Sequence, residues 1–482
     1  MSLKQKTISG LLWSSVESFS VQGIQFLFGI ILARLLSPKE FGLIGMVTVF
    51  IAVSESFINS GFSNALIRKK NCTQDDFSTV FFFNLAVGFL FFFLLLLIAP
   101  AISSFFNEPE LKAVVRVLAI VLIIDSVTII QRTILTKRID FKLQTRISVI
   151  ASVCAGIIAI ILAYSGMGVW SLVVQTLVRQ AINSLLLWLW NRWTPVRVFS
   201  RNSFRELFGF GSKLLASGLI DTLYRNIYQL IIGKYFSATE LGFYTRAHQF
   251  EALPSRNITN VMTRVSYPVL SQMQDDPDML KAGYKKMIRS SMLVTFMVML
   301  GLAAVAEPLI ITLIGEKWRT SIIYLQMLCF SGMLYPLHGI NLNMLNVKGR
   351  SDLFLKLEII KKTLAVPVIV LGVFFGIKVM IAGMIINSFI SYYINSYWSG
   401  KFINYSTREQ IKDIAPSFLL AFVVALTAFV TGYFLNTSYP LILIIQVLIC
   451  FLMFLGICEI TRMTDYLYLK QIVIEKVFKK KK

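Results

Sequence analysis

The sequence predicts an all-α, polytopic membrane protein with about fourteen transmembrane helices. The first observation is composition: of 482 residues, 56% are hydrophobic and only 15% are charged, and the mean hydropathy is +0.71. A soluble domain has about 25% charged residues and could not bury this much apolar surface in one core. The second observation is a series of apolar segments long enough to cross a bilayer, and the third is the placement of basic residues between them.

Each predicted span is a stretch of roughly 20 mainly apolar residues, the length that crosses the hydrocarbon core as a helix. The first six lie near residues 9–35, 40–64, 78–100, 113–135, 147–165 and 168–190. The next six lie near 208–235, 240–267, 286–306, 319–343, 353–376 and 378–399, and two more follow at 413–435 and 439–460. The connections are short, so we expect no soluble catalytic domain.

The basic residues set the predicted orientation. With both termini in the cytoplasm, the inside segments hold 31 Lys and Arg residues and the outside ends and loops hold eight. Cytoplasmic loops of membrane proteins are enriched in these residues, so this orientation is the one we expect. It also accounts for the net charge of +22 without a nucleic-acid partner.

An internal repeat supports the seventh and eighth spans, which are rich in charge. Residues 33–42 match residues 233–242 at a constant offset of 200, with Ser, Glu and Gly at equivalent places. We therefore predict two six-helix lobes in the same orientation, over 1–200 and 201–400, followed by two helices and a basic cytoplasmic tail over 401–482. Parallel repeats of this kind place a substrate path between the halves, near the bilayer midplane.

Six local motifs carry a family resemblance. They are GLLWSS at 10–15, ARLLSPKEFG at 33–42, SGFSNALIR at 60–68, GMGVWSLV at 166–173, FGFGSK at 208–213 and LGFYTRA at 241–247. Together they resemble the bacterial polysaccharide-transporter family of Wzx-like oligosaccharide flippases, most closely the branch for exopolysaccharide and capsule export. The resemblance covers the first ten spans and thins over the last four.

The resemblance implies the fold of the multidrug and toxin extrusion superfamily, in which two six-helix lobes surround a central cavity and work by alternating access. It implies a flippase that moves polyprenyl-pyrophosphate-linked oligosaccharide repeat units from the inner to the outer leaflet of the bacterial cytoplasmic membrane. The product would be O-antigen, capsule or exopolysaccharide. The implied partners are this lipid-linked substrate, the bilayer, and the polysaccharide polymerase or export machinery.

Polar residues inside the spans are the candidate binding site, because an ionisable group in a membrane is costly and usually faces a cavity or a partner. The planar fork of arginine suits a pyrophosphate, and amides suit sugar hydroxyls. The predicted cationic residues are Arg225, Arg256, Arg264 and Lys213, and the predicted amide residues are Gln22, Gln25, Gln229 and Gln249.

Acidic residues inside the spans are candidates for ion coupling, and we name Glu17, Glu55 and Asp221. Glu17 and Glu55 are equally compatible with a neutral, hydrogen-bonded structural role, as is Asp125 in the fourth span. Asp221 has a further alternative, because it lies four residues before Arg225 and the two can neutralise each other.

Two other charged positions also have structural alternatives. Lys213 and Arg264 lie near the cytoplasmic ends of their spans, from which long side chains reach the headgroups. Arg179 in the sixth span is more typical of a tie between helices than of a ligand.

We expect no catalytic residue, no cofactor and no metal site. The five cysteines lie singly and there are only two histidines, so neither a disulfide framework nor a zinc site is indicated. No G-x-x-x-x-G-K-[ST] phosphate loop occurs, so the chain does not hydrolyse ATP by that route. The potential of an inside-negative membrane itself favours outward movement of an anionic headgroup, by roughly 2.3 kcal/mol per charge per 100 mV.

Two other classes of function are weighed against a flippase. An ion-coupled multidrug exporter would share the fold, but mostly cationic drugs would be repelled by a cleft rich in Lys and Arg. A membrane-embedded polysaccharide polymerase or ligase would need a large outside loop with acid, base or Arg groups, and the outside connections here are short.

Overall fold

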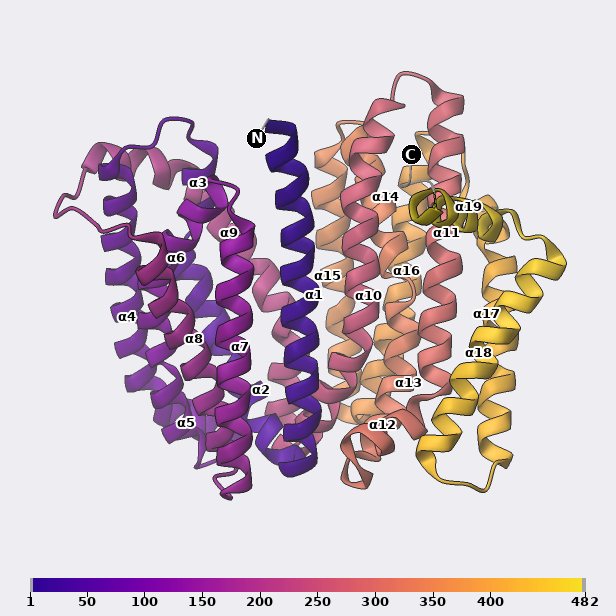
Figure 1. The fold of residues 1–482 in the computed structure, drawn as a ribbon, viewed down its shortest axis with the longest axis horizontal. Coiled ribbons are helices and arrows are strands. Elements are labelled where there is room, and N and C mark those ends of the chain that lie inside the picture. The colour runs from indigo at the N-terminus through magenta and orange to yellow at the C-terminus, as the bar shows by residue number, and fades with distance from the viewer. Residues whose placement is uncertain (1–2, 479–482) are drawn as a thin grey trace. The chain divides into compact units, whose positions relative to one another are not determined.

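The computed structural model describes residues 3–478, without the side chains of 3–12, 15, 472, 473 and 476–478, and every regular element in this range is a helix (Figure 1). All fourteen predicted segments are helical, so the all-α class is confirmed. The last part of the predicted basic tail, residues 479–482, lies outside the described residues. Contacts within the chain divide it into a first unit, Met1–Gly242, and a second unit, Phe243–Lys482. The lobes over 1–200 and 201–400, which rest on the repeat, stay a prediction.

The first unit contains nine helices among its described residues and the first turn of a tenth. They are α1 (Leu3–Leu35), α2 (Pro38–Asn59), α3 (Phe62–Arg68), α4 (Gln74–Phe106), α5 (Leu111–Leu118), α6 (Ile120–Lys137), α7 (Phe141–Tyr164), α8 (Val169–Asn191), α9 (Arg201–Tyr235) and the start of α10 (Ala238–Gln272). Within this unit α7 packs between α1 and α8, α4 packs on α6, and α2 packs on α9.

The second unit contains the rest of α10 and the helices that follow. They are α11 (Pro277–Ala304), α12 (Ala306–Ile314), the short 3-10 helix η1 (Glu316–Trp318), α13 (Thr320–Gly332), α14 (Tyr335–Val347), α15 (Ser351–Phe375), α16 (Ile377–Lys401), α17 (Thr407–Phe434), α18 (Tyr439–Thr461) and α19 (Thr464–Phe478). Within this unit α17 packs between α11 and α18, and α16 packs on α13, α14 and α15.

Capping residues explain several helix starts. The Thr73 hydroxyl accepts a hydrogen bond from the amide of Asp76 at the start of α4, and the Asp140 carboxylate accepts one from Leu143 at the start of α7. At the start of α17, Ser406 and Glu409 satisfy each other's backbone amides in a capping box. Each cap satisfies an amide that lacks a partner within its own helix.

Length and hydropathy identify eleven of the predicted spans as able to cross a membrane, among the described residues. The other three correspond to α9, α10 and α15, which are helices of 25 to 35 residues but carry more charge. Large apolar side chains stand on the outside of both units; Leu97 is 78% exposed and Phe374 is 77% exposed. Such surfaces match the acyl chains of a bilayer rather than water, so the chain is a multi-pass membrane protein.

The repeat predicted from the sequence is present in the backbone. α1 ends at Leu35 and α2 begins at Pro38, while α9 ends at Tyr235 and α10 begins at Ala238, which is again an offset of 200 residues. In both turns a serine precedes the second helix: the Ser37 hydroxyl donates to the Glu40 carboxylate, and the Ser237 hydroxyl accepts from the Glu240 amide. The shared Ser and Glu thus start both helices at equivalent positions.

Helix α19 was not predicted, because the C-terminal segment reads in the sequence as a basic tail. It docks on α11 through Arg289, whose guanidinium lies 3.0 Å from the Asp465 carboxylate. The ammonium of Lys286 lies 3.5 Å from the centre of the Tyr468 ring, within cation–π range. These contacts hold α19 against α11 within the second unit.

Candidate functional site

The polar stripe of α9 is the first part of the candidate site. Arg225 donates from Nε to the Asp221 carboxylate at 2.8 Å, so the i, i+4 pair expected from the sequence is formed. The Arg225 side chain is nevertheless 68% exposed, which leaves most of its guanidinium fork open to a further anion. Lys213, three turns earlier, is exposed as well, and Gln229, one turn later, has a buried carbonyl oxygen without a hydrogen-bond partner.

Helix α2 holds this stripe in place. The hydroxyl oxygens of Ser56 on α2 and Thr222 on α9 lie 3.0 Å apart, directly beside the Asp221–Arg225 pair. At one end of α2, Gly61 and Gly211 approach so closely that a side chain on either would overlap the backbone of the other segment. Small residues allow this close approach of two helices in a membrane, where packing replaces the hydrophobic effect as the main source of association.

A cluster of charges and amides lies behind α2 in the first unit. Glu55 on α2 and Asp125 on α6 are hydrogen-bonded to each other, and Arg179 on α8 attracts both carboxyl groups. Gln180 on α8 also donates to Asp125. The two carboxyl groups therefore lie next to each other within the first unit, and Arg179 is the cation beside them.

Helix α1 contributes the remaining predicted residues of the first unit. The Glu17 carboxylate accepts a hydrogen bond from the Ser148 hydroxyl of α7 at 2.9 Å. Gln22 donates to Ser18 of its own helix at 2.9 Å, and Gln25, nearly one turn further on, is half-buried. Glu17 is thus tied to α7.

Helix α10 carries the predicted residues of the second unit. Arg256 and Arg264 are exposed and lie two turns apart, so they point in similar directions from the helix. Arg246 is only 7% exposed, donates to Gln249, and lies 5.9 Å from the centre of the Trp318 ring. Its guanidinium is therefore occupied within the second unit, which leaves Arg256 and Arg264 as the open cations of α10 among the predicted residues.

The structure thus brings Asp221 and Arg225 together and groups Glu55 with Asp125 and Arg179. Glu251 was missed by the sequence analysis although it lies in the middle of α10, where an acidic residue is costly. Its signal in the sequence is a single acidic residue among the Arg and Gln residues of the same helix. Gln180 was missed as well, because its partner Asp125 is distant in sequence.

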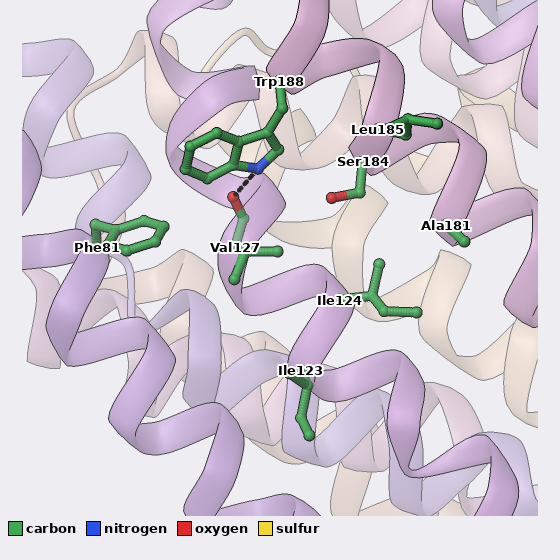
Figure 2. A pocket seen from close by; sticks show the side chains of 8 residues that line it. All are labelled: Phe81, Ile123, Ile124, Val127, Ala181, Ser184, Leu185 and Trp188. Carbon is green, nitrogen blue, oxygen red and sulfur yellow. Dashed lines mark hydrogen bonds between the residues drawn. The ribbon is translucent and has the colours of Figure 1, made fainter. Parts of the chain in front are cut away.

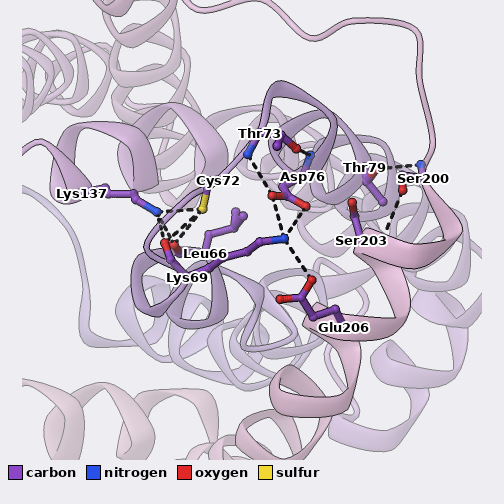
Figure 3. A network of polar contacts seen from close by, with 10 residues as sticks. All are labelled: Leu66, Lys69, Cys72, Thr73, Asp76, Thr79, Lys137, Ser200, Ser203 and Glu206. Carbon is purple, nitrogen blue, oxygen red and sulfur yellow. Dashed lines mark hydrogen bonds and ion pairs between the residues drawn. The ribbon is translucent and has the colours of Figure 1, made fainter.

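A second polar network fixes the end of α9 that begins at Arg201 (Figure 3). The Lys69 ammonium lies 3.0 Å from the Asp76 carboxylate of α4 and 3.0 Å from the Glu206 carboxylate of α9. Burial lowers the pKa of Lys69, but the hydrogen bonds to Asp76 and Glu206 outweigh it, so the pKa is raised above its usual value. The Ser200 amide donates a 2.9 Å hydrogen bond to the Thr79 hydroxyl. This bond connects the residue that precedes α9 to helix α4.

An apolar cavity of about 550 Å³ opens on the side of the first unit (Figure 2). Its walls come from α4, α6 and α8, and the Trp188 indole N–H there already donates to the Val127 carbonyl at 3.1 Å. The lining residues are Phe81, Ile123, Ile124, Val127, Ala181, Ser184, Leu185 and Trp188. Without a cation it is unsuited to a charged headgroup, and its chemistry fits a hydrocarbon chain.

Among residues 3–478, no group of three or more His, Cys, Asp and Glu side chains could hold a metal ion. His338 instead lies between Ser388, at 3.2 Å from Nε2, and Asn395, at 3.4 Å from Nδ1. These contacts place it in an interhelical hydrogen-bond network of α14 and α16.

The sequence of this chain is similar to those of proteins of polysaccharide biosynthesis. Residues 31–323 match a protein family described as "Polysaccharide biosynthesis protein". The chain is 27% identical to the teichuronic acid biosynthesis protein TuaB of Bacillus subtilis, with 73% of each chain aligned. It is 26% identical to the lipopolysaccharide biosynthesis protein WzxC of Escherichia coli, with 82% of each aligned.

Solved structures share the fold. The lipid II flippase MurJ in an inward closed conformation superposes with a TM-score of 0.76 at 14% identity, covering 94% of this chain and 98% of that one. An inward-facing multidrug resistance transporter of the MATE family superposes with a TM-score of 0.62 at 17% identity, covering 82% and 98%. These likenesses confirm a fold of the multidrug and toxin extrusion type.

Proposed function

Because the chain belongs to the polysaccharide biosynthesis protein family, we propose that it is a flippase for polyprenyl-pyrophosphate-linked oligosaccharide repeat units. It moves them from the inner to the outer leaflet of the bacterial cytoplasmic membrane by alternating access, for the assembly of a surface polysaccharide. Family and fold together make it an export-type transporter rather than an enzyme. Both termini lie in the cytoplasm, as the basic loops indicate.

The observation that carries the proposal is the open guanidinium of Arg225 on a membrane helix of this family. A substrate with a pyrophosphate needs bidentate donors inside the bilayer, where an unmatched charge is costly. Arg225 keeps most of its fork available despite its bond to Asp221, and exposed Arg256 and Arg264 offer the same chemistry on α10. Lys213 adds a fourth cation.

The glycan part of the substrate requires neutral donors and acceptors. The side-chain amides of Gln22, Gln25, Gln229 and Gln249 offer this chemistry, since an amide carries two N–H donors and a carbonyl acceptor, although the Gln249 carbonyl already accepts from Arg246. Gln229 supports this role, because its carbonyl oxygen has no hydrogen-bond partner within the described residues.

The driving force includes the membrane potential and a coupled ion. In the first unit, Glu55 is the acidic residue best suited to coupling, because it lies beside a second carboxyl group, that of Asp125, and close to the cation of Arg179. Asp221 contributes by competing with the substrate for Arg225. Glu17, bound to Ser148, is a further carboxylate on a helix of the same unit.

A multidrug exporter is the second candidate, favoured by the similarity to MATE-family structures. Its usual cationic substrates would be repelled by the open cations of α9 and α10. A polymerase or ligase would need a large outside loop, and α7 and α8, like α17 and α18, are joined by only a few residues.

The experiment is deletion of the gene in its host, followed by mass spectrometry of the lipid-linked glycans. We expect completed repeat units to build up on the cytoplasmic leaflet and surface polysaccharide to be lost, with both restored by the wild-type gene. Repeat units that reach the outer leaflet unpolymerised would indicate a polymerase. Unchanged glycans together with lost drug resistance would indicate the multidrug exporter.

A further inference from the structure

Glu251 is a buried carboxyl group whose one polar neighbour on its own helix turn is the Ser255 hydroxyl. It lies in the middle of α10, in the second unit, and its side chain is 1% exposed. Neither carboxylate oxygen has a hydrogen-bond partner of ordinary geometry among the described residues. The Ser255 hydroxyl, one turn further along the helix, is fully buried and interacts with this carboxyl group in a geometry poorer than that of an ordinary hydrogen bond. A carboxyl group and a hydroxyl that have only each other as weak partners therefore lie side by side within a membrane protein.

The surroundings of Glu251 are tightly packed. The carboxylate lies against Gly332 of α13, so closely that a side chain at Gly332 would overlap it, and the Met299 methyl of α11 lies beside the same glycine. Two ionisable groups act on Glu251 electrostatically: Arg256 on its own helix and the Cys329 thiol on α13. Neither forms an ion pair with it.

The groups around Glu251 indicate whether the carboxyl group binds a metal cation or a proton. A charged carboxylate buried without partners costs several kcal/mol, so the site requires a bound cation or a proton. A metal cation that prefers carboxylates needs several oxygen ligands, whereas the neighbours here are one hydroxyl, a thiol, a methyl group and a glycine. A proton needs only one acceptor, and the Ser255 hydroxyl can serve as that acceptor.

We propose that Glu251 is a proton-binding site of the transport cycle. It holds a proton while α10 packs against α13, and it releases that proton to water when the two helices separate. The O–H bond breaks, the proton passes to a water molecule, and Arg256 stabilises the carboxylate that remains. Coupling to transport rests on the proposed function, but the proton site itself does not.

The direct test is infrared spectroscopy of the purified full-length protein in lipid nanodiscs. The difference between wild type and Glu251→Gln should contain the carbonyl band of a protonated carboxylic acid at neutral pH. That band should weaken in alkaline buffer and shift in heavy water. The matched control is Glu409→Gln, since Glu409 is exposed and accepts hydrogen bonds from Ser406, so its removal should take away a carboxylate band instead.

A second variant guards against misfolding of the first. Ser255→Ala retains the carboxyl group but removes its acceptor, so the acid band should remain and move to higher frequency. If no acid band disappears in Glu251→Gln at any pH from mildly acid to alkaline, the proton site is wrong. An acid band that neither titrates nor exchanges in heavy water would equally overturn the proposal, because it would show a permanently neutral side chain.

The coupling is tested in proteoliposomes with lipid-linked glycan extracted from the host. An imposed pH gradient should change the rate of flipping by wild type, and Glu251→Gln should lose that response. A response that Glu251→Gln retains in full would overturn the role in the cycle. If wild type moves no glycan under any gradient, the proposed function fails, and the infrared result still decides whether Glu251 binds a proton.

Discussion

Gly42 and Gly242 pack reciprocally at the start of the two repeats. A side chain at Gly42 would overlap the Ala238 carbonyl oxygen of α10, and a side chain at Gly242 would overlap the Pro38 carbonyl oxygen of α2. The two glycines are 200 residues apart, so each repeat places its glycine against the first helical residue of the other. The first turns of α2 and α10 thus meet at backbone distance, and only glycine fits both positions.

We expect Gly42→Ala and Gly242→Ala each to destabilise the protein by about 1–3 kcal/mol, because overpacking against a carbonyl forces the helices apart. Thermal unfolding in detergent measures the loss. The control is Gly218→Ala in α9, where an added side chain would meet nothing within 4 Å. Equal stability of Gly242→Ala and Gly218→Ala would contradict the close contact.

Arg225→Ala should lower the rate of glycan flipping by about tenfold or more, the loss expected when a charge-assisted pair of hydrogen bonds is removed. Its level in the membrane should stay normal, because Arg225 is largely exposed and bonds only to Asp221 among the interactions described for it. Arg205→Ala, an exposed position on the same helix, is the control. Immunoblots of membranes and flipping assays provide the two readouts.

Asp221→Asn distinguishes substrate binding from simple neutralisation. It removes the ion pair but keeps Arg225, so we expect flipping to be retained far better than in Arg225→Ala. If the two variants lose flipping equally, the pair has a structural role and Arg225 does not bind the pyrophosphate.

Arg179→Ala should be among the most destabilising changes in the first unit, at about 3–5 kcal/mol, because it leaves the Glu55–Asp125 pair without its buried counter-charge. Adding Glu55→Gln and Asp125→Asn should restore much of that stability, since the acidic groups are then neutral. Thermal unfolding of the single and triple variants measures the rescue. A triple variant no more stable than Arg179→Ala would show that Arg179 acts through packing alone.

Lys69→Met should destabilise the first unit at the start of α9. The substitution removes the ion pairs with Asp76 and Glu206 and leaves buried Asp76 with fewer partners. We expect a loss of about 1–3 kcal/mol at neutral pH. The raised pKa of Lys69 means that its stabilisation is present below the usual lysine pKa and is lost only as pH rises through the raised value. Wild type and Lys69→Met should therefore converge in strongly alkaline buffer, whereas Lys70→Met, at an exposed neighbour, should match wild type throughout.

The sequence predicted the helices well because each span has a local signal. Apolar length predicted all fourteen spans, although α9, α10 and α15 carry enough charge to fall outside the eleven that length and hydropathy identify among the described residues, and the repeated turn supported α9 and α10. Helix α19 was not predicted from the sequence, because the contacts that hold it are with Arg289 and Lys286 of α11, which are distant in the chain.

The candidate site was less predictable, because the direction of a side chain depends on which helix packs beside it. The Asp221–Arg225 pair lies within one helix and was visible as an i, i+4 spacing. The bond between Glu55 and Asp125, and the burial of Glu251 against Gly332, join segments about 70 to 80 residues apart. Neither can be read from spacing.

The most direct test of the central claim is flipping by the purified protein in proteoliposomes. Lipid-linked glycan from the host is placed in the liposomes, and its exposure on each leaflet is followed with a membrane-impermeant lectin or oxidant. We expect wild type to equilibrate the glycan between leaflets, Arg225→Ala to do so much more slowly, and protein-free liposomes not to do so. Liposomes with correctly folded wild-type protein in which the glycan stays on its original leaflet would contradict the assignment as a flippase.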